Sequence, residues 1–174
     1  ILTSSDGNSW TSRTSGSTKK LTEVIYANDT FMAVGYEGTI LTSPDGTTWT
    51  KRTSGTTIAL RGGTYGNSTF VAVGKSGGIL TSTDGTSWEN RTSGTSARLD
   101  EIIYGNSTFV TVGNNGTILT SMDGTTWTSR TSGTTENLRG VRFGSSTFVV
   151  VGKLGTVLTS TDGTTWTSRT SGTT

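Results

Sequence analysis

Apolar and polar positions alternate along this chain in short runs, and the same runs return every 39 residues. Within one repeat, four such runs are separated by turn residues such as Gly66-Asn67-Ser68 and Thr83-Asp84-Gly85. The runs, named strands A to D in chain order, are Leu60–Tyr65, Thr69–Val73, Gly78–Ser82 and Ser87–Thr92. Four short strands with tight turns in a repeat of this length are typical of one blade of a β-propeller.

Strand B is apolar on both of its faces. Phe70 and Ala72 point to one side of the strand, while Val71 and Val73 point to the other. A strand with two apolar faces indicates a sheet that is covered by neighbouring sheets on both sides.

Each repeat carries one tryptophan and one turn aspartate at fixed positions. We expect the tryptophans on strand D, packed between adjacent blades, because an indole of this size can bury about 150–250 Å². We expect each aspartate to cap its own turn. These residues are Trp10, Trp49, Trp88, Trp127 and Trp166, and Asp6, Asp45, Asp84, Asp123 and Asp162.

Strands C and D occur five times, whereas strands A and B occur four times. The sequence therefore predicts an all-β fold, a β-propeller of four-stranded antiparallel blades in one repeat domain spanning 1–174. It comprises a two-stranded half-blade (1–18) and four complete blades (19–57, 58–96, 97–135 and 136–174). A five-bladed ring needs about 195 residues, which is 21 more than the chain has.

Three interpretations of this count stay open. The chain, which starts within a motif at Ile1 and without Met, is a piece of a longer array, or it forms a five-bladed ring with one half-blade. Alternatively, several chains assemble into one ring, since an unpaired strand edge invites another chain. We therefore expect self-association through the open half-blade.

Composition excludes several kinds of site. The chain has neither His nor Cys, so disulfides, thiolate metal sites and the commonest general base are absent. One carboxylate per turn is too few for a Ca²⁺ site, and we expect no metal and no cofactor. The net charge is +2 without a basic run, which argues against nucleic acid. No apolar stretch approaches the roughly 20 residues that span a membrane. The location stays open, with an extracellular or bacterial cell-surface setting favoured.

The segment Ser43-Pro44-Asp45-Gly46-Thr47-Thr48-Trp49 resembles an Asp-box, the hairpin motif of bacterial neuraminidase repeats. It is one residue shorter between Asp and Trp than the usual box. With the preceding AVG and GTILTS motifs, the pattern is similar to repeats of photosystem II assembly factors and sialidase-like propellers, over essentially the whole chain. The resemblance implies that the box is structural and lies away from the ligand face.

A sialidase-like enzyme would need an arginine cluster, an acid/base residue and a tyrosine nucleophile. The repeat's own arginines are expected at the rim on strand D, with cation–π or Asp pairing as local roles; they are Arg13, Arg52, Arg91, Arg130 and Arg169. Asp100 and Glu101 are neighbours, so their side chains should leave opposite faces of a strand and be solvated. They are therefore a poor pair for glycoside hydrolysis, and we expect no catalytic residues.

The repeats differ mainly in the B–C loops and in the segments before strand A. A meander brings both to one end of the blades, where we place a candidate binding face: Lys19, Tyr36, Glu37, Arg61, Lys75, Arg98, Asn114, Arg139 and Lys153. Free drift of exposed loops is the alternative explanation of this divergence. The sequence thus favours a non-enzymatic module that binds or assembles with a protein or a glycan. A structural or designed scaffold without a ligand comes second, and a sialidase-like enzyme third.

Overall fold

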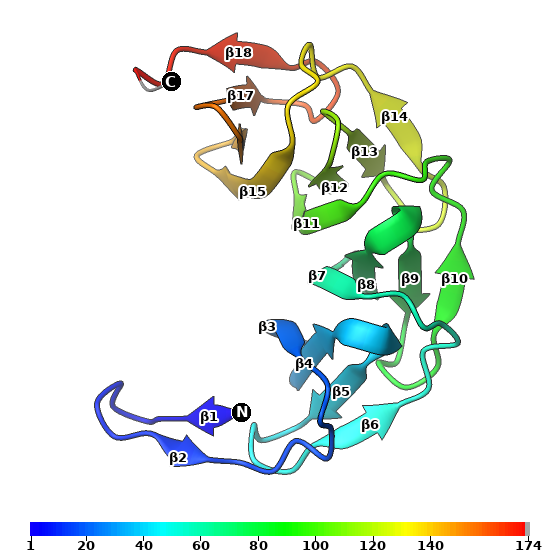
Figure 1. The fold of residues 1–174 in the computed structure, drawn as a ribbon, viewed down its shortest axis with the longest axis vertical. Helices are drawn as coiled ribbons and strands as arrows, with labels where there is room; N and C mark the ends of the chain where they lie inside the picture. Colours follow the sequence, from blue (N-terminus) through cyan, green and yellow to red (C-terminus); the bar gives the residue numbers. More distant parts are fainter. Residues whose placement is uncertain (173–174) are drawn as a thin grey trace.

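The computed structural model describes residues 1–172, which form antiparallel sheets set side by side along an open arc (Figure 1). Each sheet is a meander whose strand order follows the sequence. The half-blade is β1 (Leu2–Thr3) and β2 (Thr11–Ser12). Blade 1 is β3 (Leu21–Ala27), β4 (Thr30–Gly35), β5 (Ile40–Ser43) and β6 (Thr50–Arg52), and blade 2 is β7 (Leu60–Gly66), β8 (Thr69–Gly74), β9 (Ile79–Ser82) and β10 (Glu89–Arg91). Blade 3 is β11 (Leu99–Gly105), β12 (Thr108–Gly113), β13 (Ile118–Ser121) and β14 (Thr128–Arg130), and blade 4 is β15 (Leu138–Gly144), β16 (Thr147–Gly152), β17 (Val157–Ser160) and β18 (Thr167–Arg169).

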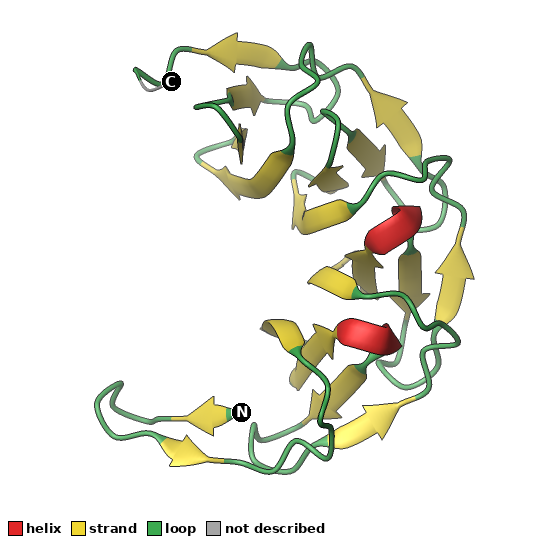
Figure 2. Ribbon diagram, in the orientation of Figure 1, coloured by secondary structure: helices red, strands yellow, loops and turns green. Residues whose placement is uncertain are grey.

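The first strand of each blade lines the concave side of the arc, and the fourth strand forms the outer rim (Figure 1). The described chain is otherwise strand and loop, apart from two 3-10 turns, η1 (Tyr36–Gly38) and η2 (Lys75–Gly77) (Figure 2). No helix in residues 1–172 is long and apolar enough to cross a membrane. The fold class predicted from the sequence is confirmed.

Local turn chemistry fixes the blades. The β7–β8 hairpin turns through Asn67 and Ser68, whose φ angles are 44° and 55°, as a two-residue hairpin turn with two left-handed residues requires. At the β9–β10 turn, Oδ1 of Asp84 accepts the backbone N–H groups of Thr86 and Ser87, both at 2.8 Å. The hydroxyl of Thr86 and these two N–H groups hold the pKa of the Asp84 carboxyl well below its usual range. The carboxylate therefore closes its own turn.

The core is a series of seams between neighbouring blades. In the seam between blades 2 and 3, Val71 and Val73 of β8 pack with Leu99 and Ile102 of β11 and with Phe109 of β12. All five side chains are at most 1% exposed. Strand β8 is thus buried on both faces, as its two apolar faces predict, and each interior blade is stabilised by both neighbours.

The tryptophans of blades 2 to 4 pack against the seams between adjacent blades, as expected, but they are only half-buried. Trp88 precedes β10 rather than lying on it, and its indole N–H donates to the Gly85 carbonyl of its own turn at 3.3 Å. This bond holds the ring over its own turn, and the half-buried indole packs against the seam cluster between blades 1 and 2. Trp10 is 59% exposed and the other four indoles are half-buried, whereas Phe70, Phe109 and Phe148 are fully buried. The largest buried side chain of blades 2 to 4 is therefore the phenylalanine of the second strand.

The arc does not close on itself. The chain ends lie at separate tips of the arc (Figure 1), and Val149 and Val151 of blade 4 remain 39% and 47% exposed. The hypothesis of a five-bladed ring made by one chain is therefore wrong.

Candidate binding face

The divergent loops gather at one end of the blades. The loop after β4 is held by two backbone bonds, from Tyr36 N–H to the Lys20 carbonyl at 2.8 Å and from Gly38 N–H to the Ile58 carbonyl at 2.6 Å. In blades 1 to 3, each such loop thereby lies beside the lead into its own first strand and the lead into the next blade. We call this end the upper face; its charged and candidate residues are Lys19, Lys20, Tyr36, Glu37, Arg61, Lys75, Arg98, Asp100, Asn114, Glu136, Arg139 and Lys153.

Charge is distributed unequally between the two ends. The upper face has seven cationic side chains and three carboxylates, a net charge of +4. The hairpin turns at the opposite end hold six aspartates and no Lys or Arg: Asp6, Asp29, Asp45, Asp84, Asp123 and Asp162. Bonds from the Ser9 and Asn8 backbone hold the pKa of Asp6 down at about 2, and the four other repeat aspartates have lowered pKa values as well. The blades are thus basic above and acidic below at neutral pH.

A β-bulge opens the first strand of every complete blade. In β11, Leu99 pairs with Gly113 and Glu101 pairs with Val112, so Asp100 is left out of the ladder. The same register shift places Thr22, Arg61 and Arg139 at the equivalent position of the other blades. A bulged residue is turned out of its sheet, and these side chains therefore point toward neighbouring blades.

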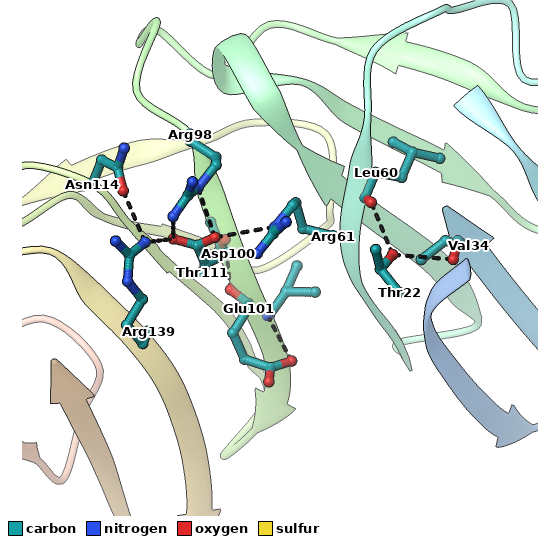
Figure 3. Close-up of polar contacts among 11 residues, drawn as sticks. Thr22, Val34, Leu60, Arg61, Arg98, Asp100, Glu101, Thr111, Asn114 and Arg139 are labelled. Atoms are coloured by element: carbon teal, nitrogen blue, oxygen red, sulfur yellow. Dashed lines mark hydrogen bonds and ion pairs between the residues drawn. The ribbon is translucent and has the colours of Figure 1, made fainter. Parts of the chain in front are cut away.

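Asp100 is the centre of an arginine cluster that joins three blades (Figure 3). Its Oδ1 lies 3.2 Å from Nε of Arg61 and 2.8 Å from Nε of Arg98, the latter at an angle unsuited to a hydrogen bond. Its Oδ2 accepts from Nη2 of Arg98 at 3.0 Å and from Nη1 of Arg139. The Asp100 side chain is only 4% exposed. The prediction that this carboxylate is solvated is wrong, because the bulge redirects it into the seam.

The arginine cluster retains positive charge and free donor capacity. The side chains of Arg61, Arg98 and Arg139 are 29%, 28% and 35% exposed. Arg139 also donates to Oδ1 of Asn114 at 2.9 Å. Three guanidinium groups around one carboxylate leave a net charge of +2, and each guanidinium has five N–H donors. The cluster therefore keeps N–H donors and a net positive charge at its solvent side.

Glu101 leaves the strand in the other direction and pairs with Arg142 at 3.1 Å, with a side chain that is 15% exposed. It is therefore not solvated either, contrary to prediction. Burial, and secondly the charge of Glu101, raises the pKa of Glu23 on β3. Asp100 and Glu101 thus belong to different ionic groups.

The structure brings some of the predicted face together and leaves the rest apart. Arg61, Arg98, Asn114 and Arg139 converge around Asp100. Lys19 instead pairs with Glu37 at 2.7 Å on blade 1, where Tyr36 lies under the Lys20 ammonium. Lys75 and Lys153 are exposed at the loops of blades 2 and 4.

The rim arginines have a different local role from the one expected. Nε of Arg52 donates to Oγ1 of Thr42 on the neighbouring strand at 2.7 Å, and the other four repeat arginines make the equivalent bond. Cross-strand pairing with threonine thus takes the place of the predicted cation–π or Asp pairing.

Asp100 is the residue of this site that the sequence prediction missed. The repeat spacing could have identified it. Arg61, Asp100 and Arg139 occupy the same position in successive repeats, each 39 residues from the next. Opposite charges at one position of adjacent blades indicate a contact across the seams.

These sheets and seams define a β-propeller repeat domain. The family model described as the DUF6242 beta propeller domain matches residues 1–90, about half of the chain. The chain belongs to this family. The likeness to Asp-box repeats stays a prediction from the sequence, and no curated protein matches the chain.

Two solved structures have the same fold. The structure titled "YCF48 bound to D1 peptide" superposes with a TM-score of 0.69 at 22% identity, covering 88% of this chain and 54% of that one. YCF48 from Cyanidioschyzon merolae gives a TM-score of 0.66 at 18% identity, with coverage of 86% and 56%. This chain thus spans just over half the length of either structure. At these identities the likeness is one of fold.

Proposed function

We propose that this chain is a non-enzymatic binding module whose upper face takes an extended, acidic segment of a partner protein. The single observation behind this proposal is the arginine cluster around Asp100, with its net charge of +2 and its partly exposed guanidinium groups. Arginine pairs with carboxylates through two parallel N–H donors, which gives geometric selectivity as well as attraction.

The surroundings of the cluster favour an extended ligand. Lys75 and Lys153 lie exposed on loops to either side of the three arginines, so cationic groups follow the arc from blade 2 to blade 4. A peptide with several carboxylates can contact such a row at more than one point, whereas a neutral glycan gains little from it. YCF48, which has the same fold, is bound to D1 peptide in its structure, and this supports a peptide as the ligand.

The chemistry of the cluster favours binding over catalysis. A general base needs a carboxylate that is free to accept a proton. Both oxygens of Asp100 are already paired with arginine, and the carboxylate is almost fully buried. We therefore assign Asp100 the role of positioning the three guanidinium groups.

A scaffold without a ligand is the second candidate, because the same ion pairs also tie three blades together. Fluorescence anisotropy of a short, labelled, Asp- and Glu-rich peptide separates the two candidates. We expect binding that weakens as salt increases, and about tenfold weaker binding for Arg139→Gln, corresponding to about 1.4 kcal/mol.

The matched control is Arg130→Gln, which removes the same type of side chain from the rim, where it contacts Thr120. This variant should bind the acidic peptide as the unmodified protein does, and a Lys-rich peptide should not bind the upper face. Absence of acidic-peptide binding at low salt, or equal loss in the two variants, would contradict the proposed function.

A further inference from the structure

Exposed apolar side chains are concentrated at the two tips of the arc. Eight large hydrophobic side chains are exposed among the described residues, and six of them lie on the half-blade, on β3 or on β16: Leu2, Trp10, Val24, Tyr26, Val149 and Val151. Each has an equivalent in the interior repeats that packs within a seam. Val24 is 55% exposed, whereas its equivalent Ile102 is 1% exposed. The two tips thus expose the side chains that form the two sides of an interior seam.

The interior seams show what would cover each tip. Val71 of β8 packs in one cluster with Leu99 and Ile102 of the next blade. On the 39-residue repeat, Val149 is the equivalent of Val71, and Val24 is the equivalent of Ile102. Val149 is 39% exposed while Val71 is fully buried. Blade 4 therefore presents one side of this contact and blade 1 presents the other.

A second contact repeats in the same way. A Cβ added to Gly66 would lie 2.0 Å from the Tyr104 ring, and one added to Gly105 would lie 2.4 Å from the Phe143 ring, so each aromatic ring packs on the glycine of the preceding blade. The next glycine in this series, Gly144, has nothing within 4 Å of its Cβ position. The first ring of the series, Tyr26, is 58% exposed. The Tyr26 ring at the first tip therefore has no glycine to pack on, and Gly144 at the other tip has no ring packed against it.

The first tip also contains a groove, lined in part by Ile1, Leu2, Leu21, Val24 and Trp49. Ile1 has the place that Ile79 has in the interior seam, and its sheet consists of the two strands β1 and β2. The third strand of a complete blade pairs on both sides, as β9 pairs with β8 and β10, whereas β1 pairs with β2. The groove thus lies beside an open strand edge.

We propose that a second copy of this chain fills this groove with its β15–β16 hairpin. Val149 and Val151 of one copy pack on Leu21 and Val24 of the other, and Tyr26 packs on Gly144. The joint continues the three interior seams and uses the same residue positions. This proposal is independent of the upper face and of its ligand.

One rearrangement of strands accompanies the joint. Residues 1–16 align with residues 157–172, residue by residue, at a spacing of four repeats. The two segments therefore compete for the outer positions of the closing blade, and one of them leaves the seam. Contacts of this kind run head to tail, and two of them close a ring of two chains.

A charge-swap pair tests the joint, with the mass in solution measured by light scattering after size exclusion. We expect the unmodified chain to have the mass of two chains. Val24→Glu and Val149→Arg should each give single chains, because each places a charge in an apolar seam. Both positions are exposed in the single chain, so the fold should be retained.

Mixing the two variants should restore the mass of two chains. In the mixed pair, the carboxylate introduced by Val24→Glu meets the guanidinium introduced by Val149→Arg at one joint, while the second joint is unmodified. Met122→Glu is the control, because Met122 is 74% exposed but lies away from both tips. A single-chain mass for the unmodified protein at all concentrations overturns the proposal. The proposal is also overturned if Met122→Glu abolishes association while Val24→Glu does not. It is overturned as well if the two mixed variants fail to associate.

Discussion

Replacement of Asp100 by Asn tests whether the arginine cluster holds three blades together. The Asp100 side chain is 4% exposed and contacts Arg61, Arg98 and Arg139. Asn keeps the shape of the side chain but removes its charge, and its amide donors would face guanidinium donors. Three cations would then lie close together without the carboxylate that separates them.

The magnitude follows from burial. Removing one partner of a fully buried ion pair costs about 3–5 kcal/mol, whereas exposed pairs contribute about 0.2–1 kcal/mol. The carboxylate is buried, but the arginine side chains are 28% to 35% exposed and can regain some hydration. We therefore expect a loss of about 2–3 kcal/mol, at or just below the lower end of the buried range. For a domain of this size the midpoint of thermal unfolding should fall by about 4–12 °C.

Chemical denaturation, with thermal unfolding followed by circular dichroism, measures this loss. Glu89→Gln is the matched control, because it removes the carboxylate of an exposed ion pair with Arg91, where the Glu89 side chain is 68% exposed. The control should lose less than about 1 kcal/mol. If Asp100→Asn lost no more than Glu89→Gln, the cluster would not connect the blades and the assignment of Asp100 as a positioning residue would be refuted.

Three further predictions follow from the turns and seams. Phe109→Ala should cost about 3–5 kcal/mol in the free energy of unfolding, and half-buried Trp127→Ala about half as much; equal losses would contradict the different burial of the two rings. Gly77→Ala should cost more than about 1 kcal/mol, because Gly77 has a φ of 66° and an added Cβ would lie 1.9 Å from the Thr95 carbonyl oxygen; urea unfolding at constant m-value measures it. The lowered pKa of Asp84 in the folded chain means that its stabilising effect is present above the ordinary value of 3.8 and is lost as the pH falls below it. The unfolding temperature should therefore drop between about pH 5 and about pH 2, and the drop should be smaller in Asp84→Asn.

The repeat period was sufficient to predict the blades and their number, because turn chemistry and apolar alternation are local properties. The hairpin at Asn67-Ser68 and the turn at Asp84 are determined by residues within three positions of each other. Strand B was also predictable, since Phe70 and Ala72 are buried in one seam while Val71 and Val73 are buried in the adjacent seam. Local patterns of this kind need no knowledge of the rest of the fold.

What the sequence prediction missed depends on departures from regular strand geometry. Alternation assigned Asp100 and Glu101 to opposite faces of a strand, but the bulge removes Asp100 from the ladder and places it among arginines 39 residues away on either side. Size alone suggested Trp88 as the core residue, yet its N–H bonds to its own turn and keeps the ring at the seam edge. In both cases the charge or size of the side chain was recognised from the sequence, but a local departure from regular strand geometry determined where that side chain lies.

The bulge also explains how a nearly uniform repeat can carry a distinct site. Backbone bonds such as Gly38 N–H to the Ile58 carbonyl fix the upper loops whatever the exposed side chains are. The bulged position of each first strand is therefore free to vary, and it reads Thr22, Arg61, Asp100 and Arg139 along the arc. Thr22 bonds to the Leu60 carbonyl at 2.9 Å, whereas the other three residues form ion pairs across two seams. Variation at this repeat position thus contributes Arg61, Asp100 and Arg139 to the cluster over blades 2 to 4 and leaves the blade architecture unchanged.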